Sequence, residues 1–383
     1  MKTSQEVIVV TTMRKHGSSG LQTYINNLAD QINKTGGNAS ILTPFNYSKI
    51  VTTIVFGFRK LVDPFSDELS TWWHEYWHYY FLKLALARKL RRNSRYNITS
   101  MLYAQCPLSA KACLETRLPG QRVFMVVHFN VSVADEWADK KKIKRGGRQF
   151  RSIRNREQQV IPALDGVVFV SEFMKKKIEQ NISSGSALNA ACIPCFTSKP
   201  VINNHPHTNN DLISIGTLEA RKNHAYILKV LSIAKDQGHR FSLTLVGDGP
   251  ERESLQKLAI ELDIKSQVHF LGYQHNGSKF IPGHKIYLHS ALIENLPISL
   301  LEAQSCGLPI IAPAVGGIPE IISDGKEGFF WPLDDPETGA KKLLALMLNP
   351  ELNHSMTEAA KLKFHSTFDT DIVVEKLQKF WKQ

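Results

Sequence analysis

Two glutamates eight residues apart, Glu294 and Glu302, are the side chains best placed in this sequence to bind a polar ligand. Glu294 follows a strand-like apolar run. Glu302 falls within a helix expected to run from Pro297, in its first turn, to about Cys306. The N-terminus of such a helix offers backbone N–H groups to an anion, and a carboxylate accepts hydrogen bonds from a diol such as ribose. The pattern therefore predicts a pocket for a nucleotide sugar.

Two adjacent cations could neutralise the phosphates of such a ligand. Arg221 and Lys222 follow a predicted strand that ends at Gly216, and a pair of positive charges beyond a strand end suits a diphosphate. A helix-entry loop with exposed charge is the alternative. Near the N-terminus, the Gly/Ser loop at 17–20 joins the first predicted strand to the first helix. Its backbone N–H groups either hold a phosphate or form a plain turn.

Strands alternating with helices must position these residues. Short β-branched runs predict strands at 7–10, 98–103, 123–127, 167–170, 212–215, 242–246, 268–271, 286–289 and 309–312. Because helical periodicity separates them, we expect parallel sheets covered on both faces. The pattern restarts near residue 211, after a polar stretch at 199–210. We predict two doubly wound domains, 1–198 and 199–364, which face a cleft and bind ligands at the carboxyl ends of their strands.

The composition is that of an ordinary globular protein, with 383 residues, 43% hydrophobic and 21% charged. No apolar run reaches the ~18 residues of a membrane-spanning helix, and the first residues lack the long apolar region of a secretory signal. Five cysteines fit a reducing compartment. Cys192 and Cys195, which close a strand-like run, are interpreted as structural rather than as a redox or zinc pair. We expect a cytoplasmic protein, soluble or peripheral to a membrane.

Positive charge is concentrated in the first half. Residues 1–199 hold 29 Lys and Arg against 14 Asp and Glu, whereas residues 200–383 hold 18 against 21. This asymmetry predicts contact with an anionic surface. Within the first half, an aromatic helical stripe precedes several arginines, which indicates docking at a bilayer interface; a core helix with a basic end is the alternative. The stripe comprises Trp73, Tyr76, Trp77, Tyr80 and Leu84. The residues assigned to membrane or acceptor contact are Trp72, Trp73, Tyr76, Trp77, Arg88, Arg91 and Arg92.

A second basic segment, 140–156, carries nine Lys and Arg residues and is interrupted by Gly146 and Gly147. It is interpreted either as a mobile loop that touches a phosphorylated acceptor or lipid, or as a solvated helix face. The sequence favours neither.

These motifs together resemble bacterial retaining glycosyltransferases of the GT-B fold in the large glycosyltransferase 4 family. The resemblance covers about 6–40 and nearly all of 211–333, whereas 45–95 and 135–160 match no known pattern. It is carried by the segments 216–222, 245–251, 270–273, the Glu294/Glu302 pair with 306–309, and 316–320. It implies two Rossmann-like domains and a C-terminal helix, within 365–383, that crosses back onto the N-terminal domain.

The resemblance also implies a role for each matching residue. Glu294 is expected to bind hydroxyls of the donor sugar, Glu302 the ribose, and Lys222 the diphosphate. His128 is expected near the donor sugar and acceptor, so Glu294, Lys222 and His128 are the catalytic candidates. The backbone N–H groups expected to contact phosphate or sugar are those of Gly20, Asn295, Leu296 and Ile298.

Some positions depart from the family pattern. Thr217 stands where many relatives carry an arginine, so Arg221 is expected to take its place in the diphosphate clamp. Pro297 replaces a frequent glycine and lacks an N–H group. Asp369 and Asp371 form a DxD sequence at the expected start of the last helix, where capping explains it better than a metal site. We expect no metal and no cofactor.

The expected activity is transfer of a hexose or hexosamine, with retention, from a nucleotide diphosphate sugar to a membrane-associated glycan or glycolipid. A UDP-sugar donor is favoured, and surface polysaccharide or lipopolysaccharide biosynthesis is the expected process. The expected location is the inner face of the cytoplasmic membrane. A nucleotide-sugar epimerase or hydrolase that acts without a lipid acceptor is the alternative. A nucleic-acid-binding protein is disfavoured because no nucleic-acid-binding motif accompanies the basic charge.

Overall fold

The computed structural model describes residues 5–15, 17, 20–62, 66–181, 188–197 and 210–383. The chain divides into two compact units. The first comprises Met1–Pro194 and Val373–Gln383, and the second comprises Cys195–Ile372. Residues 365–372, which the sequence analysis grouped with the first domain, therefore lie in the second unit. The polar stretch expected to link the domains falls almost entirely outside the described residues.

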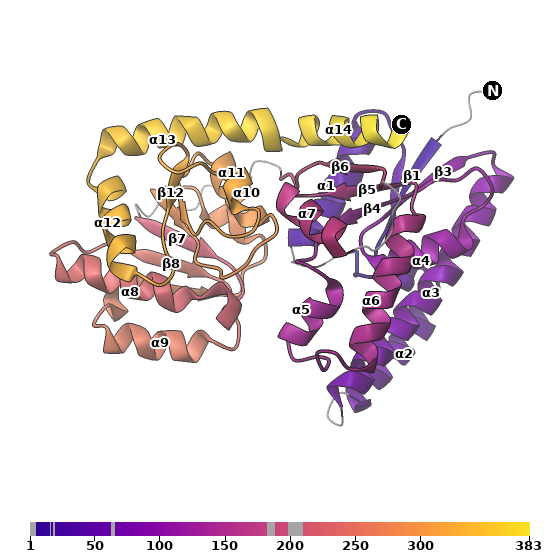
Figure 1. Cartoon of the computed structure of the whole chain (residues 1–383), viewed down its shortest axis with the longest axis horizontal. Helices are drawn as coiled ribbons and strands as arrows, with labels where there is room; N and C mark the ends of the chain where they lie inside the picture. Colours follow the sequence, from indigo (N-terminus) through magenta and orange to yellow (C-terminus); the bar gives the residue numbers. More distant parts are fainter. Residues whose placement is uncertain (1–4, 16, 18–19, 63–65, 182–187, 198–209) are drawn as a thin grey trace. The chain divides into compact units, whose positions relative to one another are not determined.

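The first unit contains a six-stranded parallel sheet in the order β2-β1-β3-β4-β5-β6 (Figure 1). Its strands are β1 (Gln5–Val10), β2 (Ala39–Leu42), β3 (Thr99–Ala104), β4 (Val123–Val127), β5 (Gly166–Phe169) and β6 (Ala190–Cys192). All five residues of β4 are fully buried, as expected of a central strand with helices on both faces. The predicted strands are confirmed, and β6 is the strand-like run that ends at Cys192. The edge strand β2 was not predicted.

Before residue 195, the described part of the first unit contains seven α-helices. They are α1 (Gly20–Lys34), α2 (Lys49–Val62), α3 (Asp67–Arg95), α4 (Pro107–Thr116), α5 (Val133–Asp139), α6 (Arg148–Val160) and α7 (Glu172–Asn181). The long helix α3 begins at Ser66, whose hydroxyl accepts a hydrogen bond from Leu69 N at 3.2 Å. Its Leu82 and Leu86 are buried in the same core as β3 and β4.

The C-terminal helix α14 (Thr370–Lys382) packs on the first unit, which confirms the predicted return of the chain. Trp381 meets Tyr103 of β3 edge to face at 4.8 Å between ring centroids, and Phe380 meets Phe124 of β4 at 5.6 Å. At the start of α14, Asp369 Oδ1 accepts a hydrogen bond from Asp371 N at 3.2 Å. The DxD sequence thus caps a helix, as predicted.

The second unit contains another six-stranded parallel sheet, in the order β12-β11-β10-β7-β8-β9. Its strands are β7 (Leu212–Ile215), β8 (Leu243–Val246), β9 (Val268–Gly272), β10 (Ile286–Leu288), β11 (Ile310–Ala312) and β12 (Gly328–Phe330). The five predicted strands are confirmed, and β12 was not predicted. The helices are α8 (His224–Asp236), α9 (Arg252–Glu261), α10 (Ile298–Ser305), α11 (Ile318–Ile321), α12 (Pro336–Met347) and α13 (Pro350–Lys363). The alternation confirms the α/β class.

Candidate functional site

The strand order of the second unit reverses between β7 and β10, which pair in parallel. Strands β8 and β9 lie on one side of this pair, and β11 and β12 lie on the other. Open α/β sheets bind ligands at such a switch point, outside the carboxyl ends of the strands. The loop after β7 carries Arg221 and Lys222, and the loop after β10 carries Glu294. The topology therefore brings together residues that lie 72 positions apart.

The Glu294 carboxylate is the centre of this site. Its Oε1 atom forms an ion pair with Lys222 Nζ and lies 3.4 Å from His289 Nε2 and 3.6 Å from Arg221 Nη1. Its side chain is only 9% exposed. Burial acts to raise the pKa of Glu294, but the charge of Lys222 and the contact with His289 outweigh it and hold that pKa well below its usual range. Glu294 is therefore an ionised acceptor at neutral pH.

Hydrogen bonds join the two loops directly. Leu292 N donates to Arg221 O at 2.9 Å, and Ser290 Oγ donates to the carbonyl of Lys222 at 2.8 Å. Arg221 Nη1 donates to Ile293 O at 3.0 Å. The guanidinium of Arg221, expected in the diphosphate clamp, also pairs with a carboxylate of its own loop. Arg221 thus fixes the backbone before Glu294.

A glycine packs against the backbone of the loop that carries Glu294. Gly316 has φ +57°, and a Cβ built on it would lie 1.7 Å from Glu294 O. The next residue, Gly317, donates its N–H to the same carbonyl at 3.2 Å. Only a residue without a side chain permits this approach. The 316–320 motif therefore positions Glu294 through its backbone.

Two histidines beside the site are neutral at physiological pH. Burial lowers the pKa of His289 and lowers that of His224 to about 3. Trp331 Nε1 donates to His289 O at 2.9 Å and anchors that residue. The sequence analysis assigned no role to His289. Its position at the end of the predicted strand 286–289, where ligands bind, was the signal that could have identified it.

Helix α10 carries Glu302. The helix begins at Ile298, and Pro297 occupies the N-cap position with extended backbone, φ −70° and ψ 118°. The prediction that Pro297 lies in the first turn is thus wrong by one position. Its missing N–H still removes one donor from the loop. Asn295 and Leu296, two of the expected donors, lie just before the helix and are buried.

Glu302 has an environment opposite to that of Glu294. Burial raises the pKa of Glu302 to about 7, and a hydrogen bond from Ser278, in the 3-10 helix Gly277–Phe280, only partly opposes this shift. Both carboxylates act electrostatically on the buried hydroxyl of Tyr287 in β10, whose pKa burial raises. The hydroxyl hydrogen-bonds to Ile215 O at 3.1 Å. The two glutamates therefore flank one region of the sheet edge.

The remaining expected site residues lie in the first unit. Gly20 is the first residue of α1, while Ser18 and Ser19 of the predicted phosphate loop fall outside the described residues. His128 follows β4, and its ring lies 4.8 Å from that of Tyr24 on α1. Burial lowers the pKa of His128 to about 3, so its imidazole is neutral at physiological pH. The shared site of His128 and Glu294 stays a prediction.

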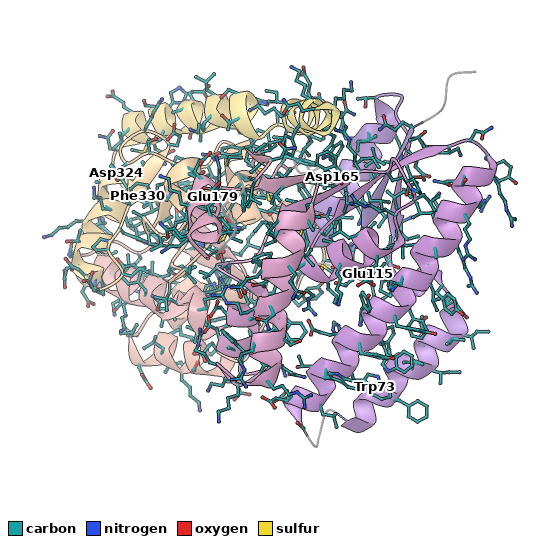
Figure 2. All side chains as sticks on the ribbon, turned by 45° about the vertical axis from the view of Figure 1, so that its right-hand side comes forward. Trp73, Glu115, Asp165, Glu179, Asp324 and Phe330 are labelled. Carbon is teal, nitrogen blue, oxygen red and sulfur yellow. The ribbon has the colours of Figure 1, made fainter. Side chains whose placement is uncertain are left out.

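The aromatic segment of α3 is helical, but its exposed stripe differs from the predicted one. Trp72, Tyr76 and Tyr80 are 49%, 46% and 44% exposed. Trp73, which Figure 2 labels, is half-buried, and so is Trp77. Trp73 Nε1 donates to Val55 O of α2 at 3.2 Å. The covering helix α2 was not recognised in the sequence. Tyr76 and Tyr80 of the predicted stripe are exposed, as is Trp72, whereas Trp73 and Trp77 are half-buried.

Helix α2 adds exposed apolar side chains that the sequence analysis did not single out. Ile50, Ile54 and Phe58 are 75%, 55% and 55% exposed. With Trp72, Tyr76 and Tyr80 of α3 they make up what we call the aromatic surface. At the other end of α3, Arg88 lies over the ring of Tyr47 at 4.0 Å. Arg88, Arg91 and Arg92 are exposed.

The described residues form neither a metal site nor a membrane-spanning helix. Within the described ranges, no three His, Cys, Asp or Glu side chains are grouped so that they could hold a metal ion. In the same part of the chain, no helix is both long and apolar enough to cross a bilayer.

Known proteins resemble part of the chain in sequence. Residues 196–363 match the family described as Glycosyl transferases group 1. An uncharacterized glycosyltransferase of Haemophilus influenzae is 31% identical over 175 residues, 45% of this chain and 48% of that protein. The putative colanic acid biosynthesis glycosyltransferase WcaL of Escherichia coli is 24% identical over 191 residues, 48% of this chain and 47% of that protein. The chain spans about half the length of these curated relatives.

A solved structure resembles the whole chain in fold. The crystal structure of Anabaena Alr3699/HepE in complex with UDP and glucose matches 98% of this chain and 99% of its own, with a TM-score of 0.68 and 14% sequence identity. Residues 196–363 are thus similar to the glycosyl transferases group 1 family, and the chain has the GT-B fold.

Proposed function

We propose that this protein is a retaining glycosyltransferase that transfers a hexose or hexosamine from a UDP-sugar to a membrane-associated glycan or glycolipid. The observation that carries the proposal is the arrangement of Lys222, Glu294 and Glu302 at the switch point of the second sheet. A nucleotide diphosphate sugar contains three groups that need partners: a diphosphate, a ribose and a hexose. A cation and two carboxylates in different electrostatic environments match them.

The donor would be held by complementary groups. Lys222 would share its charge between Glu294 and the diphosphate, which develops negative charge as the glycosidic bond breaks. Preorganised donors of this kind contribute about 10²–10³ in rate each. The N–H groups at the start of α10 would assist. Glu294, kept ionised, would accept hydrogen bonds from sugar hydroxyls, and Glu302 would accept them from the ribose.

Retention would follow from attack on the face from which the diphosphate departs. Retaining glycosidases use a carboxylate nucleophile about 5 Å from a carboxylic acid. Here Glu294 is paired with Lys222, and Glu302 is assigned to the ribose, so neither is free for that role. The acceptor oxygen would bond to the anomeric carbon as the carbon–oxygen bond to the diphosphate breaks. The hydroxyl proton would pass to the departing phosphate oxygen.

The choice of UDP and of a glycan acceptor rests on similar proteins. HepE of Anabaena is described in complex with UDP and glucose, and WcaL of Escherichia coli is named for colanic acid biosynthesis. We extend both features to this chain as proposals. Surface polysaccharide or lipopolysaccharide biosynthesis is the process we propose for it.

Donor turnover tests this proposal. UDP release from UDP-glucose and UDP-N-acetylglucosamine would be measured with and without a bacterial membrane-lipid extract, and the anomeric configuration of the product would be determined by NMR. We expect release that depends on the extract and an α-linked product from these α-linked donors. UDP release without the extract would favour a hydrolase, and formation of a new UDP-sugar without UDP release would favour an epimerase. A β-linked product would contradict retention.

Membrane association is proposed from the aromatic surface. Aromatic rings settle at headgroup depth and arginines meet anionic lipid, so the aromatic surface and the basic end of α3 suit the inner face of the cytoplasmic membrane. Flotation with vesicles that contain phosphatidylglycerol should recover the wild type. The Trp72→Ser/Tyr76→Ser variant should stay unbound. The matched control Leu348→Ser/Leu362→Ser removes residues 54% and 71% exposed in the second unit and should float. Equal flotation of both variants would exclude the aromatic surface as the docking site.

A further inference from the structure

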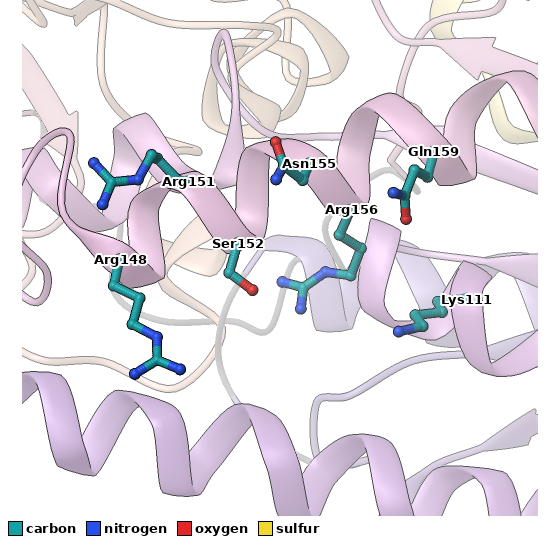
Figure 3. A pocket seen from close by; sticks show the side chains of 7 residues that line it. All are labelled: Lys111, Arg148, Arg151, Ser152, Asn155, Arg156 and Gln159. Atoms are coloured by element: carbon teal, nitrogen blue, oxygen red, sulfur yellow. The ribbon is translucent and has the colours of Figure 1, made fainter.

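A basic pocket lies in the first unit, in the second half of the basic segment 140–156. Its volume is about 360 Å³. Helix α6 supplies most of the lining and α4 supplies a lysine (Figure 3). The lining residues that matter here are Lys111, Arg148, Arg151, Ser152, Asn155 and Arg156. We call this the basic pocket.

The helical repeat of α6 creates the pocket. Arg148, Ser152 and Arg156 are spaced four residues apart and therefore share one face of the helix. Figure 3 shows all three projecting to the same side, with Lys111 of α4 reaching toward Arg156. The part of the basic segment 140–156 from Arg148 onward is thus an ordered helix face.

The positive charge in the basic pocket is only partly balanced. Arg156 Nη2 lies 2.5 Å from Glu75 Oε1 of α3, while its buried Nε atom has no hydrogen-bond partner among the described residues. Lys111 lies 3.8 Å from Glu115, which Lys83 holds more closely at 2.7 Å.

Two further arginines add uncompensated charge. In the part of the chain that the structure describes, no carboxylate lies within 4.0 Å of the guanidinium of Arg148 or Arg151. Arg151 donates instead to the carbonyl of Gly146 at 2.6 Å. Four cations thus line the hollow. Among the described carboxylates, Glu75 lies 2.5 Å from Arg156, and Glu115 lies farther off, at 3.8 Å from Lys111.

We infer that the basic pocket binds a phosphate or diphosphate group. Guanidinium forks match the oxygens of a phosphate in pairs, and several converging cations suit a multiply charged anion better than a single carboxylate. Ser152 and Asn155 add hydroxyl and amide donors. The ion pair with Glu75 holds the guanidinium of Arg156 in place.

The position of Glu75 relates the pocket to the aromatic surface. Glu75 lies on α3 between Trp72 and Tyr76, both of which are exposed. A phosphate bound beside Arg156 would therefore lie near the surface proposed to meet the membrane. One part of the inference rests on the proposed function, namely that the phosphate would belong to a lipid-linked acceptor.

Titration calorimetry with inorganic pyrophosphate tests the inference. Wild type should show binding at two sites, one in the basic pocket and one beside Lys222. The Lys111→Gln/Arg148→Gln variant should weaken the first at least about tenfold, since a hydrogen bond to a charged group contributes about 1.5–3 kcal/mol. The control Lys176→Gln/Lys376→Gln removes two exposed cations from the same unit and should bind as wild type does.

The variants separate the basic pocket from the donor site beside Lys222. Unchanged pyrophosphate binding in Lys111→Gln/Arg148→Gln would overturn the inference, as would an equal loss in the control. Lys222→Gln should remove only the other site, and its failure to do so would count against the donor site, not against the basic pocket. The charge-preserving Arg148→Lys should retain part of the affinity. Competition by phosphatidic acid vesicles would assign the pocket to lipid phosphate, and competition by soluble phosphate alone would assign it to a free anion.

Discussion

The contrast between the two carboxylates predicts that donor binding depends on pH through Glu302. Its pKa is about 7 in the free protein, because burial disfavours its charge. Ribose hydroxyls donate hydrogen bonds, so they bind the ionised form better. If only that form binds, the apparent Kd is multiplied by about two at pH 7 and by about eleven at pH 6, relative to its value at high pH. Affinity should therefore rise with pH and level off above pH 8.

Neighbouring groups should not produce this profile. The pKa of His224 is about 3 and that of Glu294 lies well below its ordinary value, so these two side chains keep one charge state between pH 6 and 8. Burial lowers the pKa of His289, which favours its neutral form. Glu302→Gln keeps the shape but cannot ionise. It should bind UDP at least about tenfold more weakly at pH 8, since a hydrogen bond to a charged acceptor is lost. Any pH dependence of the UDP affinity that remains in this variant comes from the nucleotide.

Calorimetric titration at pH 6, 7 and 8 would give the Kd of wild type and of Glu302→Gln for UDP. The difference between the two pH dependences is the contribution of Glu302. The reasoning is refuted if the Kd of wild type and that of Glu302→Gln change equally with pH, or if wild type binds UDP more tightly below pH 7.

The stability of the free protein provides a second test of the Glu302 pKa. Because the folded-state pKa lies above the ordinary value of 4.5, Glu302 should lower stability as pH rises from about 4.5 to 7. Glu302→Gln should lack that decline.

Three further substitutions test other parts of the structure. Lys222→Ala should lower kcat by about 10²–10³ in steady-state assays; a loss under tenfold would remove Lys222 from leaving-group stabilisation. Gly316→Ala should lower the thermal stability more than Gly238→Ala, because both have positive φ but only the former places its Cβ against Glu294 O; equal melting temperatures would contradict the close approach. Leu377→Ala should cost about 2–5 kcal/mol in denaturant unfolding, since this residue of α14 is fully buried; a cost near zero would show that α14 does not pack as described.

The sequence was sufficient to predict the sheet cores because their strands are short apolar runs between helices. Residues 123–127 and 212–215 show that pattern and form β4 and β7. The two edge strands that were not predicted are short: β2 has four residues and β12 has three. The donor loops could be predicted because Arg221, Lys222 and Glu294 follow strand ends, where ligands bind in α/β sheets.

Other features depend on contacts between distant segments and could not be read from local patterns. Trp73 is covered by α2 through a hydrogen bond to Val55, so the sequence periodicity alone placed the exposed stripe incorrectly. The basic pocket needs Lys111 and Arg156 from two helices. Charge counting identified the arginines of α6 but could not show that Glu75 balances only one of them.

Nucleotide binding to the second unit tests the central claim most directly. Thermal unfolding would be followed with UDP, GDP, ADP and CMP for wild type, Lys222→Ala and Glu302→Ala. UDP at 100 times its Kd should stabilise wild type by about 2.7 kcal/mol, and both variants should lose that gain at the same concentration. If none of the four nucleotides stabilises wild type, or if UDP stabilises both variants equally well, the donor site proposed around Lys222, Glu294 and Glu302 is contradicted.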